Sequence, residues 1–575
     1  MMARLWLVVA LLALPLAVPA DNTADRSLPP EPAVATAHPL ATEAALEILA
    51  SGGNAFDAAV AATASLAVVE PYGSGIGGGG FWLLHHEADN RQVMVDGRET
   101  APAAAHRDMY LDEDGEVRSR LSLDGPMAAA IPGTPAALVH ITDAYGRLSL
   151  AENLAPAIRQ AREGFEVGPH YRRMARFRQD ALRASPHARA IMLQEGEVPP
   201  LGHVIRQPDL AWTLEQLAEH GLDGFYRGPV AERLVAGNRH AGGNWTLEDL
   251  ESYRLEEREP VIFQYHDMTI TAASLPSAGG IALATMLQIL EPFDLQAMGP
   301  AGRIHLTVEA MRRAYRDRHL YLGDPDFVDV PVERLTSRAH ADRLREDLRV
   351  DRATPSKSLD VDAQGGEETT HFSIIDAEGN RVGATLSINY PFGSGFIPAG
   401  TGVLLNNEMD DFASQPGKPN AYGLVGGENN AIEPGKRPLS SMTPVFVEDD
   451  SRVAVIGSPG GSRIITQVLL GILHFADGLE PHELVSAPRY HHQYLPDRIQ
   501  HEPGAITVET RRELVYKGHR VTPMTRQYGD MQAVLWHKQE QRVTAASDHR
   551  GGGLAVPAAT VPETAPEPLG EKNGR

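Results

Sequence analysis

The pattern of apolar positions in the first third of the chain predicts two helices followed by a strand. Residues 42–50 repeat apolar positions with a helical period and stop at Gly52-Gly53. Residues 56–69 are apolar on most faces, which predicts a buried helix. Six glycines then occupy the eight positions 73–80, before the strand-like FWLL. From 135 to 350 the pattern is mostly helical, as in LAWTLEQLAEHG and IALATMLQILEPF.

The apolar period changes to two near residue 368. The polar stretch 362–368, DAQGGEE, has the composition of an exposed connection, and TTHFSIIDAEGNRVGATLSIN then alternates around a Glu-Gly-Asn turn. This predicts a β-hairpin centred on Glu378-Gly379, with Thr369 opposite residues 388–390 and with Ser387 and Asn389 within about one residue of it. The last third keeps a strand-and-turn character, with helices predicted near 463–475 and 509–517.

Both ends of the chain differ in composition from the middle. Residues 1–20 contain Arg4, an apolar run and the small residues Val18 and Ala20, which predict a secretory signal peptide cleaved before Asp21. An uncleaved membrane anchor is the alternative, but two prolines interrupt this short stretch. No other window reaches about 18 uninterrupted apolar residues. We therefore expect an exported protein, periplasmic or extracellular, with no membrane association after signal removal. Residues 21–36 resemble a mobile arm, and 556–575 a disordered tail.

Charge and cysteine content exclude several classes of function. The 575 residues carry 52 Lys and Arg against 75 Asp and Glu, a net charge of −23, which argues against nucleic acid as a partner. The chain has no cysteine, which excludes disulfides, thiolate metal sites and a cysteine nucleophile. His85-His86 and His491-His492 are adjacent pairs rather than ligand-spaced ones, so no metal site is expected. The chemistry must come from hydroxyls, carboxylates, imidazoles, amines and backbone amides.

Thr369 is a candidate nucleophile because it begins a predicted strand directly after the exposed connection. A threonine hydroxyl needs a base to take its proton. Cleavage between Glu368 and Thr369 would create an α-amine in the same residue, and the ordinary pKa of such an amine, about 7.7–8.0, suits general-base catalysis. From spacing alone, the favoured interpretation is that Thr369 and Thr370 are ordinary β-forming residues at the start of a strand.

Longer motifs identify the family that this chain resembles. In order and spacing they are similar to the motifs of the gamma-glutamyltransferase (gamma-glutamyl transpeptidase) family, over residues 38–550. The motifs are LASGGNAFDAAVAA, VVEPYGSGIGGGGF, DGRETAP, IPGTPAAL, YLGDPDF, TTHFS, FGSG, LLNNEMDDFA, KRPLSSMTP, GSPGGSRIITQ and APRYHHQ. The resemblance implies an α+β fold, the four-layer αββα sandwich of N-terminal-nucleophile hydrolases. It also implies one domain built from two autocleaved chains, a large subunit 21–368 and a small subunit 369–575 that stay together as a heterodimer.

The resemblance also implies roles for individual residues. Thr369 is the nucleophile of autocleavage and of catalysis, and Ser387 stands where the family usually has a threonine bonded to it. The other matching positions imply a γ-glutamyl pocket. The resemblance assigns Arg98, Ser440 and Ser441 to binding of the α-carboxylate, and Asn389, Glu408 and Asp411 to binding of the α-ammonium. It assigns Gly460 and Gly461 to binding of the oxyanion, and it places Tyr422 in a lid formed by residues 416–430. Arg550 is near a family arginine, but the local sequence departs there and no role is assigned to it.

The implied activity is hydrolysis or transfer of γ-glutamyl groups from glutathione and related compounds to water, amino acids or peptides, with no cofactor. One alternative is an acylase of the same fold acting on glutaryl-cephalosporins or polyglutamate. A second is a dinucleotide-binding protein, because Gly73, Gly75 and Gly78 satisfy G-x-G-x-x-G; however, helix and strand flank these glycines in the reverse of the required order. A third is an exported binding protein that never matures.

Overall fold

The computed structural model describes residues 27–118, 120–356, 369–415, 417–418, 420 and 422–557. The predicted signal peptide 1–20, Glu368 and residues 558–575 of the predicted tail lie outside the described residues.

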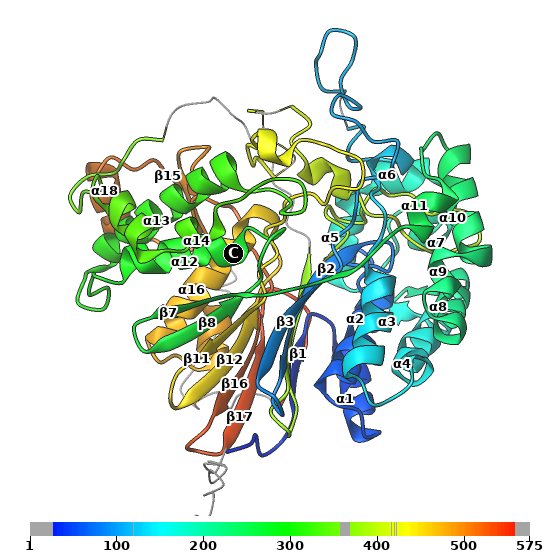
Figure 1. The fold of residues 1–575 in the computed structure, drawn as a ribbon, viewed down its shortest axis with the longest axis horizontal. Helices are drawn as coiled ribbons and strands as arrows, with labels where there is room; N and C mark the ends of the chain where they lie inside the picture. The colour runs from blue at the N-terminus through cyan, green and yellow to red at the C-terminus, as the bar shows by residue number, and fades with distance from the viewer. Residues whose placement is uncertain are drawn as a thin grey trace, which may run out of the picture.

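Two antiparallel sheets form the centre of the molecule (Figure 1). The seven-stranded sheet has the order β18 (Leu554–Val556), β1 (Ala33–Thr36), β9 (Thr370–Ile375), β10 (Arg381–Ser387), β2 (Gly79–His86), β3 (Arg91–Asp96) and β6 (Glu256–Arg258). The six-stranded sheet has the order β17 (Arg542–Ser547), β16 (Gln532–His537), β12 (Arg452–Gly457), β11 (Val445–Glu448), β8 (Met268–Ala272) and β7 (Val261–Tyr265).

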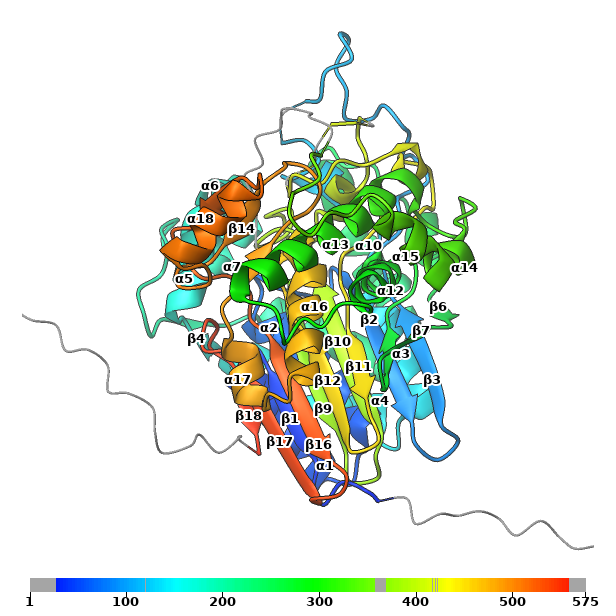
Figure 2. The same ribbon diagram turned by 90° about the vertical axis from the view of Figure 1, so that its left-hand side faces the viewer.

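Helices cover the outer face of each sheet (Figures 1 and 2). The seven-stranded sheet packs against a layer built from α1 (Pro39–Ala50), α2 (Ala55–Val69), α3 (Thr134–Tyr145), α4 (Leu150–Glu163), α5 (Pro169–Phe177), α8 (Pro208–His220), α9 (Asp223–Tyr226) and α10 (Gly228–His240). The six-stranded sheet packs against α12 (Gly279–Leu290), α13 (Pro300–Tyr321), α16 (Ile464–Ala476) and α17 (Pro481–Ser486). The predicted four-layer αββα sandwich is therefore confirmed.

Shorter elements complete the fold. They are α6 (Gln179–Ala184), α7 (Pro186–Met192), α11 (Leu247–Glu251), α14 (Val332–Leu335), α15 (Arg338–Arg345), α18 (Val508–Tyr516), β4 (Phe165–Glu166), β5 (Val204–Ile205), β13 (Tyr490–His491), β14 (Ile499–His501), β15 (Val521–Pro523), and the 3-10 turns η1 (Pro126–Ala128), η2 (Glu408–Asp411), η3 (Glu428–Asn430) and η4 (Gly461–Arg463).

The apolar run FWLL shows how the layers are joined. Phe81 and Leu83 belong to the core that fills the space towards the six-stranded sheet, and Trp82 and Leu84 to the core under the helices. Side chains alternate between the two faces of a strand, so a strand covered on both faces must be apolar throughout. Helix α2 is buried along all 15 of its residues, as predicted, and it starts at a capping box formed by Asn54 and Asp57.

One expectation about the first part of the chain is wrong. Residues 33–36 are not part of a mobile arm but form β1, which lies between β18 and β9 inside the larger sheet. Long-range strand pairing decides this segment, and such pairing leaves little trace in a local pattern. The region 135–350 is mostly helical, as expected, and the hairpin β7–β8 at 261–272 is its main exception.

The hairpin β9–β10 forms, but its register differs from the predicted one. Thr370 faces Leu386, so continuation of the ladder brings Thr369 to Ser387 rather than to residues 388–390. Asp376 accepts hydrogen bonds from the amides of Glu378 and Asn380, and Gly379 has a φ of +91°. These contacts centre the turn on Glu378, and a one-residue shift of the turn displaces every cross-strand partner.

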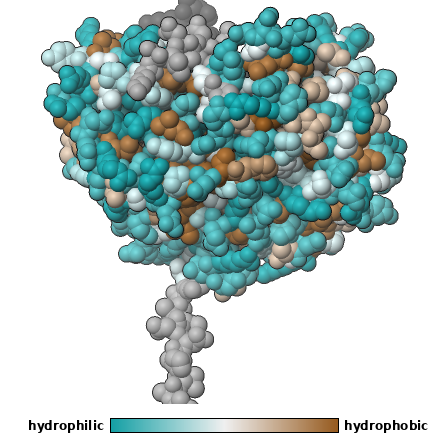
Figure 3. Space-filling model, turned by 45° about the horizontal axis from the view of Figure 1, so that its top comes forward, coloured by the Kyte–Doolittle hydropathy of each residue, from teal (hydrophilic) through white to brown (hydrophobic). Residues whose placement is uncertain are grey.

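The surface is predominantly hydrophilic on the face drawn in Figure 3, where apolar residues are scattered among polar ones. Of the helices in the described part of the chain, none combines the length and apolar character needed to cross a membrane.

Candidate active site

The residues predicted to act on a substrate come together at one end of the sandwich. Thr369 precedes β9, Ser387 ends β10, Arg98 follows β3, and Ser440 and Ser441 precede β11. Antiparallel pairing brings these strand ends together within each sheet, because β10 ends where β9 begins and β11 begins where β12 ends. A cavity of about 20 Å³ lies among them, and its lining includes Thr369, Ser387, Arg98, Asn389, Glu408, Asp411, Tyr422, Ser440, Ser441 and Gly461. Of the predicted site residues that the structure describes, Gly460 alone does not line it.

Thr369 and Ser387 lie at the centre of the larger sheet. Thr369 is 5% exposed. The Ser387 hydroxyl accepts a hydrogen bond of 2.7 Å from the amide of Asn389, which has a φ of +69°. The glycine-rich segment explains why the end of β10 is so closely packed: a Cβ at Gly78 would lie 2.2 Å from the Ser387 carbonyl oxygen. These glycines therefore serve close backbone packing, and the segment runs from helix to strand, which excludes the dinucleotide-binding alternative.

Arg98 is the central charge of the pocket. Its guanidinium pairs with the Glu408 carboxylate, donates to Asp411 Oδ2 at 2.6 Å and donates to the Pro438 carbonyl at 3.0 Å. Arg98 and Glu408 are each 1% exposed. The pocket thus places a cation directly against two carboxylates, an arrangement that can bind a zwitterion by exchanging partners with it.

Burial and mutual repulsion perturb the acidic groups. Burial, reinforced by the charge of Asp411 and opposed by Arg98, raises the pKa of Glu408 to about 7. Burial, with the charge of Glu408, also raises the pKa of Glu99 well above its usual range. Neither oxygen of Glu99 accepts a hydrogen bond from a described residue. Glu99 directly follows Arg98, and its role in this electrostatic cluster is absent from the sequence prediction.

Two serines and a glycine pair complete the lining. Ser440 Oγ accepts a hydrogen bond from the Met442 amide at 3.1 Å. The buried Ser441 hydroxyl has no hydrogen-bond partner among the described residues and borders the cavity. Gly460 and Gly461 have φ values of +134° and +54°, which glycine alone adopts readily; Gly460 precedes η4, Gly461 begins it, and α16 follows directly. The positive end of the α16 dipole therefore points towards this corner.

Tyr422 packs against the other residues that line the cavity. Its hydroxyl donates to the Asn389 carbonyl at 2.6 Å, and its ring lies so near Gly461 that a Cβ there would meet Cε1 of the ring at 2.4 Å. A volume of about 20 Å³ holds about one water molecule. A ligand the size of a glutamyl group therefore requires side chains of the lining to move.

Arg318 of α13 is a further lining residue that the sequence analysis missed. It lies in the helix just before the YLGDPDF motif. This helix contains several arginines, and the helical pattern does not indicate which of them faces the cavity. Arg550, to which no role was assigned, pairs with Glu502 and Asp548 and is not part of the lining.

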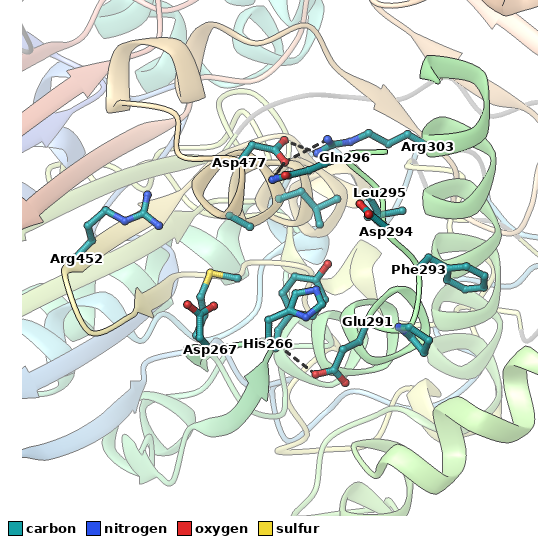
Figure 4. A pocket seen from close by; sticks show the side chains of 15 residues that line it. His266, Asp267, Glu291, Phe293, Asp294, Leu295, Gln296, Arg303, Arg452 and Asp477 are labelled. Atoms are coloured by element: carbon teal, nitrogen blue, oxygen red, sulfur yellow. Dashed lines mark hydrogen bonds and ion pairs between the residues drawn. The ribbon is translucent and has the colours of Figure 1, made fainter. Parts of the chain in front are cut away.

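The other polar clusters do not resemble this site. A cavity of about 510 Å³ beside the β7–β8 turn is drawn in Figure 4; there Asp477 binds Arg303 and Gln296, and the His266 amide donates to Glu291. Within the described residues, His305, Glu309 and His519 bring potential metal-ligand atoms within 4.8 Å of one another. Two arginines, Arg312 and Arg313, already pair with Glu309 and would oppose a cation.

Three of the four histidines in the adjacent pairs are buried and hydrogen-bonded, and the fourth, His86, is partly exposed and contacts Asp89 at 2.7 Å. His85 contacts Glu87 at 2.8 Å, and His491 contacts Thr466 at 2.8 Å. His492 contacts Asp497 at 3.2 Å. None of these histidines lines the candidate site.

Comparison with known proteins agrees with the geometry of the site. A family model described as Gamma-glutamyltranspeptidase matches residues 41–558. A glutathione hydrolase proenzyme of Escherichia coli is 40% identical over 510 residues, 87% of each chain. One of Pseudomonas aeruginosa is 42% identical over 534 residues, 91% of this chain and 94% of that protein. The crystal structure of cephalosporin acylase from Bacillus halodurans has a TM-score of 0.80 at 26% identity, covering 95% of this chain and 99% of that one. The chain belongs to the gamma-glutamyltranspeptidase family.

Proposed function

We propose that this protein is a gamma-glutamyltransferase and glutathione hydrolase that uses Thr369 as its nucleophile. The observation that carries the proposal is the convergence of Thr369 with Arg98, Glu408 and Asp411 on one small cavity. A γ-glutamyl group presents a carboxylate and an ammonium on one carbon, and this pocket offers a cation and two carboxylates side by side. The names of the relatives at 40% and 42% identity support the same substrate class.

Maturation is the first step of the proposed cycle. The precursor is exported by its signal peptide 1–20 to the periplasm or the exterior. It then cleaves itself between Glu368 and Thr369 and leaves chains 21–368 and 369–575. Without cysteine no disulfide joins the two chains, but each contributes strands to both sheets. Strand β9 of the small chain pairs with β1 of the large chain, and β11 pairs with β8. These shared ladders support a stable heterodimer.

Acyl transfer follows from the positions of the groups. Thr369 Oγ attacks the γ-carbonyl carbon while its own α-amine takes the hydroxyl proton. The amides of Gly460 and Gly461 stabilise the oxyanion, with help from the α16 dipole. The proton then passes to the leaving nitrogen, the C–N bond breaks and a γ-glutamyl-threonine ester remains. Water, or the amine of an amino acid or peptide, attacks this ester and restores Thr369.

The proposed binding mode exchanges partners around Arg98. The α-carboxylate of the substrate takes the guanidinium together with the Ser440 and Ser441 hydroxyls, and the Ser441 hydroxyl has no other described partner. The α-ammonium takes Glu408, Asp411 and Asn389. Tyr422 opens to admit the donor and then closes over it. No metal or organic cofactor takes part in these steps.

A matched pair of substrates tests the proposal. We expect the purified, processed protein to release nitroaniline from γ-glutamyl-p-nitroanilide at least about ten-fold faster than from glutaryl-p-nitroanilide, which lacks only the α-ammonium, because loss of a buried ionic contact costs at least this factor. The cephalosporin acylase with the same fold makes the glutaryl substrate the relevant competitor. Equal or faster turnover of the glutaryl anilide would favour the acylase alternative, and turnover of neither would favour a non-enzymatic protein.

The raised pKa of Glu408 predicts a pH dependence of donor binding. Glu408 must be ionised to accept the α-ammonium, so KM for the γ-glutamyl anilide should fall as the pH rises through about 7. In Glu408→Gln the amide does not titrate, and KM should vary at least about three-fold less between pH 6 and 8. The pH profile of kcat should be the same in Glu408→Gln as in the wild type, because the Thr369 amine governs it.

Stability provides an independent readout of the same pKa. Because the native protein retains a proton on Glu408 between pH 4.5 and about 7 that the unfolded chain loses, this group makes the free energy of unfolding decrease with rising pH in that window. The Tm of the wild type should therefore fall relative to that of Glu408→Gln from pH 5 to 8. If the difference in Tm between the wild type and Glu408→Gln stays constant from pH 5 to 8, and their KM profiles run parallel, the pKa of Glu408 is not raised and this prediction is wrong.

A further inference from the structure

Arg318 is a buried cation with an unusual environment. Arg318 lies near the carboxyl end of α13, is 5% exposed and borders the candidate active site. Among the residues that the structure describes, its guanidinium forms no hydrogen bond and no ion pair, and its Nε is fully enclosed without an acceptor. Its nearest charges are Asp411, which attracts it, and Arg98, which repels it.

Three other buried arginines show how such a charge is usually stabilised. Arg178 donates to the carbonyls of Pro391 and Gly393. Arg313 pairs with Glu309 and Arg489 with Asp548. A guanidinium does not lose its proton to escape burial, and an unpaired charge in the interior is strongly unfavourable. Packing alone would favour an apolar residue at position 318, so the unpaired charge points to an anion that arrives with a ligand.

A second cavity reaches Arg318 from the other side. It has a volume of about 150 Å³ and shares Arg318, Asp411 and Leu424 with the active-site cavity. Its lining contains the cations Arg120 and Lys418, which pair with Asp124 and Glu116, and the carboxylates Asp410 and Asp411. Among the described residues, Arg318 is therefore the cation without an ion pair at the place where the γ-glutamyl pocket meets this larger, polar space.

We infer that Arg318 binds a carboxylate of the substrate and is a second anion-binding residue beside Arg98. This inference rests on the proposed function, because γ-glutamyl donors and their acceptors are carboxylates. Two sources are available: the α-carboxylate of the γ-glutamyl group, shared between the two arginines, or a carboxylate on the leaving group or acceptor, bound in the second cavity.

The test compares Arg318→Met with Arg318→Lys and with Arg316→Met. Arg316 is an exposed arginine of the same helix that lines neither cavity, so its variant controls for loss of charge on α13. Each processed enzyme is assayed with γ-glutamyl-p-nitroanilide and with γ-glutamyl-3-carboxy-4-nitroanilide, whose leaving group carries a carboxylate. The rise in Tm caused by L-glutamate is measured in parallel.

We expect Arg318→Met to keep or raise the Tm of the free enzyme, because an unpaired buried charge is removed. If Arg318 binds the α-carboxylate, affinity for L-glutamate falls about 10- to 100-fold. If it binds the carboxylate of the leaving group, any preference in KM for the carboxylated anilide is lost instead. Arg318→Lys should restore part of either effect, and Arg316→Met should match the wild type.

The direction in which glutamate affinity changes in Arg318→Met distinguishes a direct contact between Arg318 and the carboxylate from a long-range electrostatic effect of its charge. Removing a positive charge near Asp411 would by itself strengthen binding of the α-ammonium, so weaker glutamate binding signals a lost anion contact. The inference is overturned if Arg318→Met matches the wild type both in its response to L-glutamate and in the ratio of the two KM values. Failure of the wild type to cleave either anilide would instead overturn the proposed function.

Discussion

Replacing Thr369 by alanine is expected to leave a single uncleaved chain and to lower γ-glutamyl anilide hydrolysis by at least about 10⁴-fold. Both effects have one physical cause. In the proposed mechanism one hydroxyl attacks both the Glu368–Thr369 peptide and the donor, and its base for catalysis is the α-amine that cleavage frees. A denaturing gel, amino-terminal sequencing of the small chain and release of nitroaniline measure the three consequences.

Thr370 provides the matched control. It is the next residue along the chain, fully buried at the start of β9, and its hydroxyl has no hydrogen-bond partner among the described residues. Thr370→Val keeps the shape and should therefore process and turn over within about three-fold of the wild type. Thr369→Ser keeps the hydroxyl and should process, although more slowly. Cleavage at residue 368 in Thr369→Ala, or its loss in Thr370→Val alone, would contradict the assignment of the nucleophile.

Replacing Arg98 by methionine should lower kcat/KM for γ-glutamyl donors by about 100- to 1,000-fold, mostly through KM. The change removes the cation proposed to bind the α-carboxylate. It also leaves Glu408 and Asp411 without their common partner at the bottom of the cavity. Because the pKa of Glu408 is already about 7, that carboxyl can take up a proton, so the variant should still fold and process. Steady-state kinetics and the same denaturing gel measure both outcomes.

Two variants make the Arg98 result specific. Arg98→Lys keeps the charge but loses the planar fork that binds two oxygens, so its KM should lie between those of wild type and Arg98→Met. Arg159→Met removes an arginine of the same predicted subunit whose partner, Glu47, is exposed like itself, and it should change KM less than about two-fold. An unchanged KM in Arg98→Met would exclude Arg98 as the carboxylate-binding residue.

Much of the candidate site is readable from the sequence, because its residues lie in contiguous motifs around strand ends. DGRETAP carries Arg98, LLNNEMDDFA carries Glu408 and Asp411, and each motif needs only its local turn to present these side chains. Helix α2 could be predicted as buried for a similar local reason, since apolar residues cover all its faces.

The remaining features depend on contacts between distant segments. Arg318 is one of several arginines on α13, and only the packing of that helix against the small chain separates it from exposed Arg316. The place of β1 between β18 and β9 depends on pairing with residues more than 300 positions away. A local pattern contains no information about such partners.

By itself the sequence determines the family and most of the residues that line the pocket, and it predicts the two-chain plan and a threonine nucleophile in a chain without cysteine. These properties reside in local motifs and composition. Only the tertiary structure decides the register that aligns Thr369 with Ser387, the mixing of residues before and after position 368 in both sheets, the raised pKa of Glu408 and the unpaired charge of Arg318. All four features depend on contacts between segments that are distant in the sequence. Such contacts form, and bury their side chains away from water, only when the layers pack together.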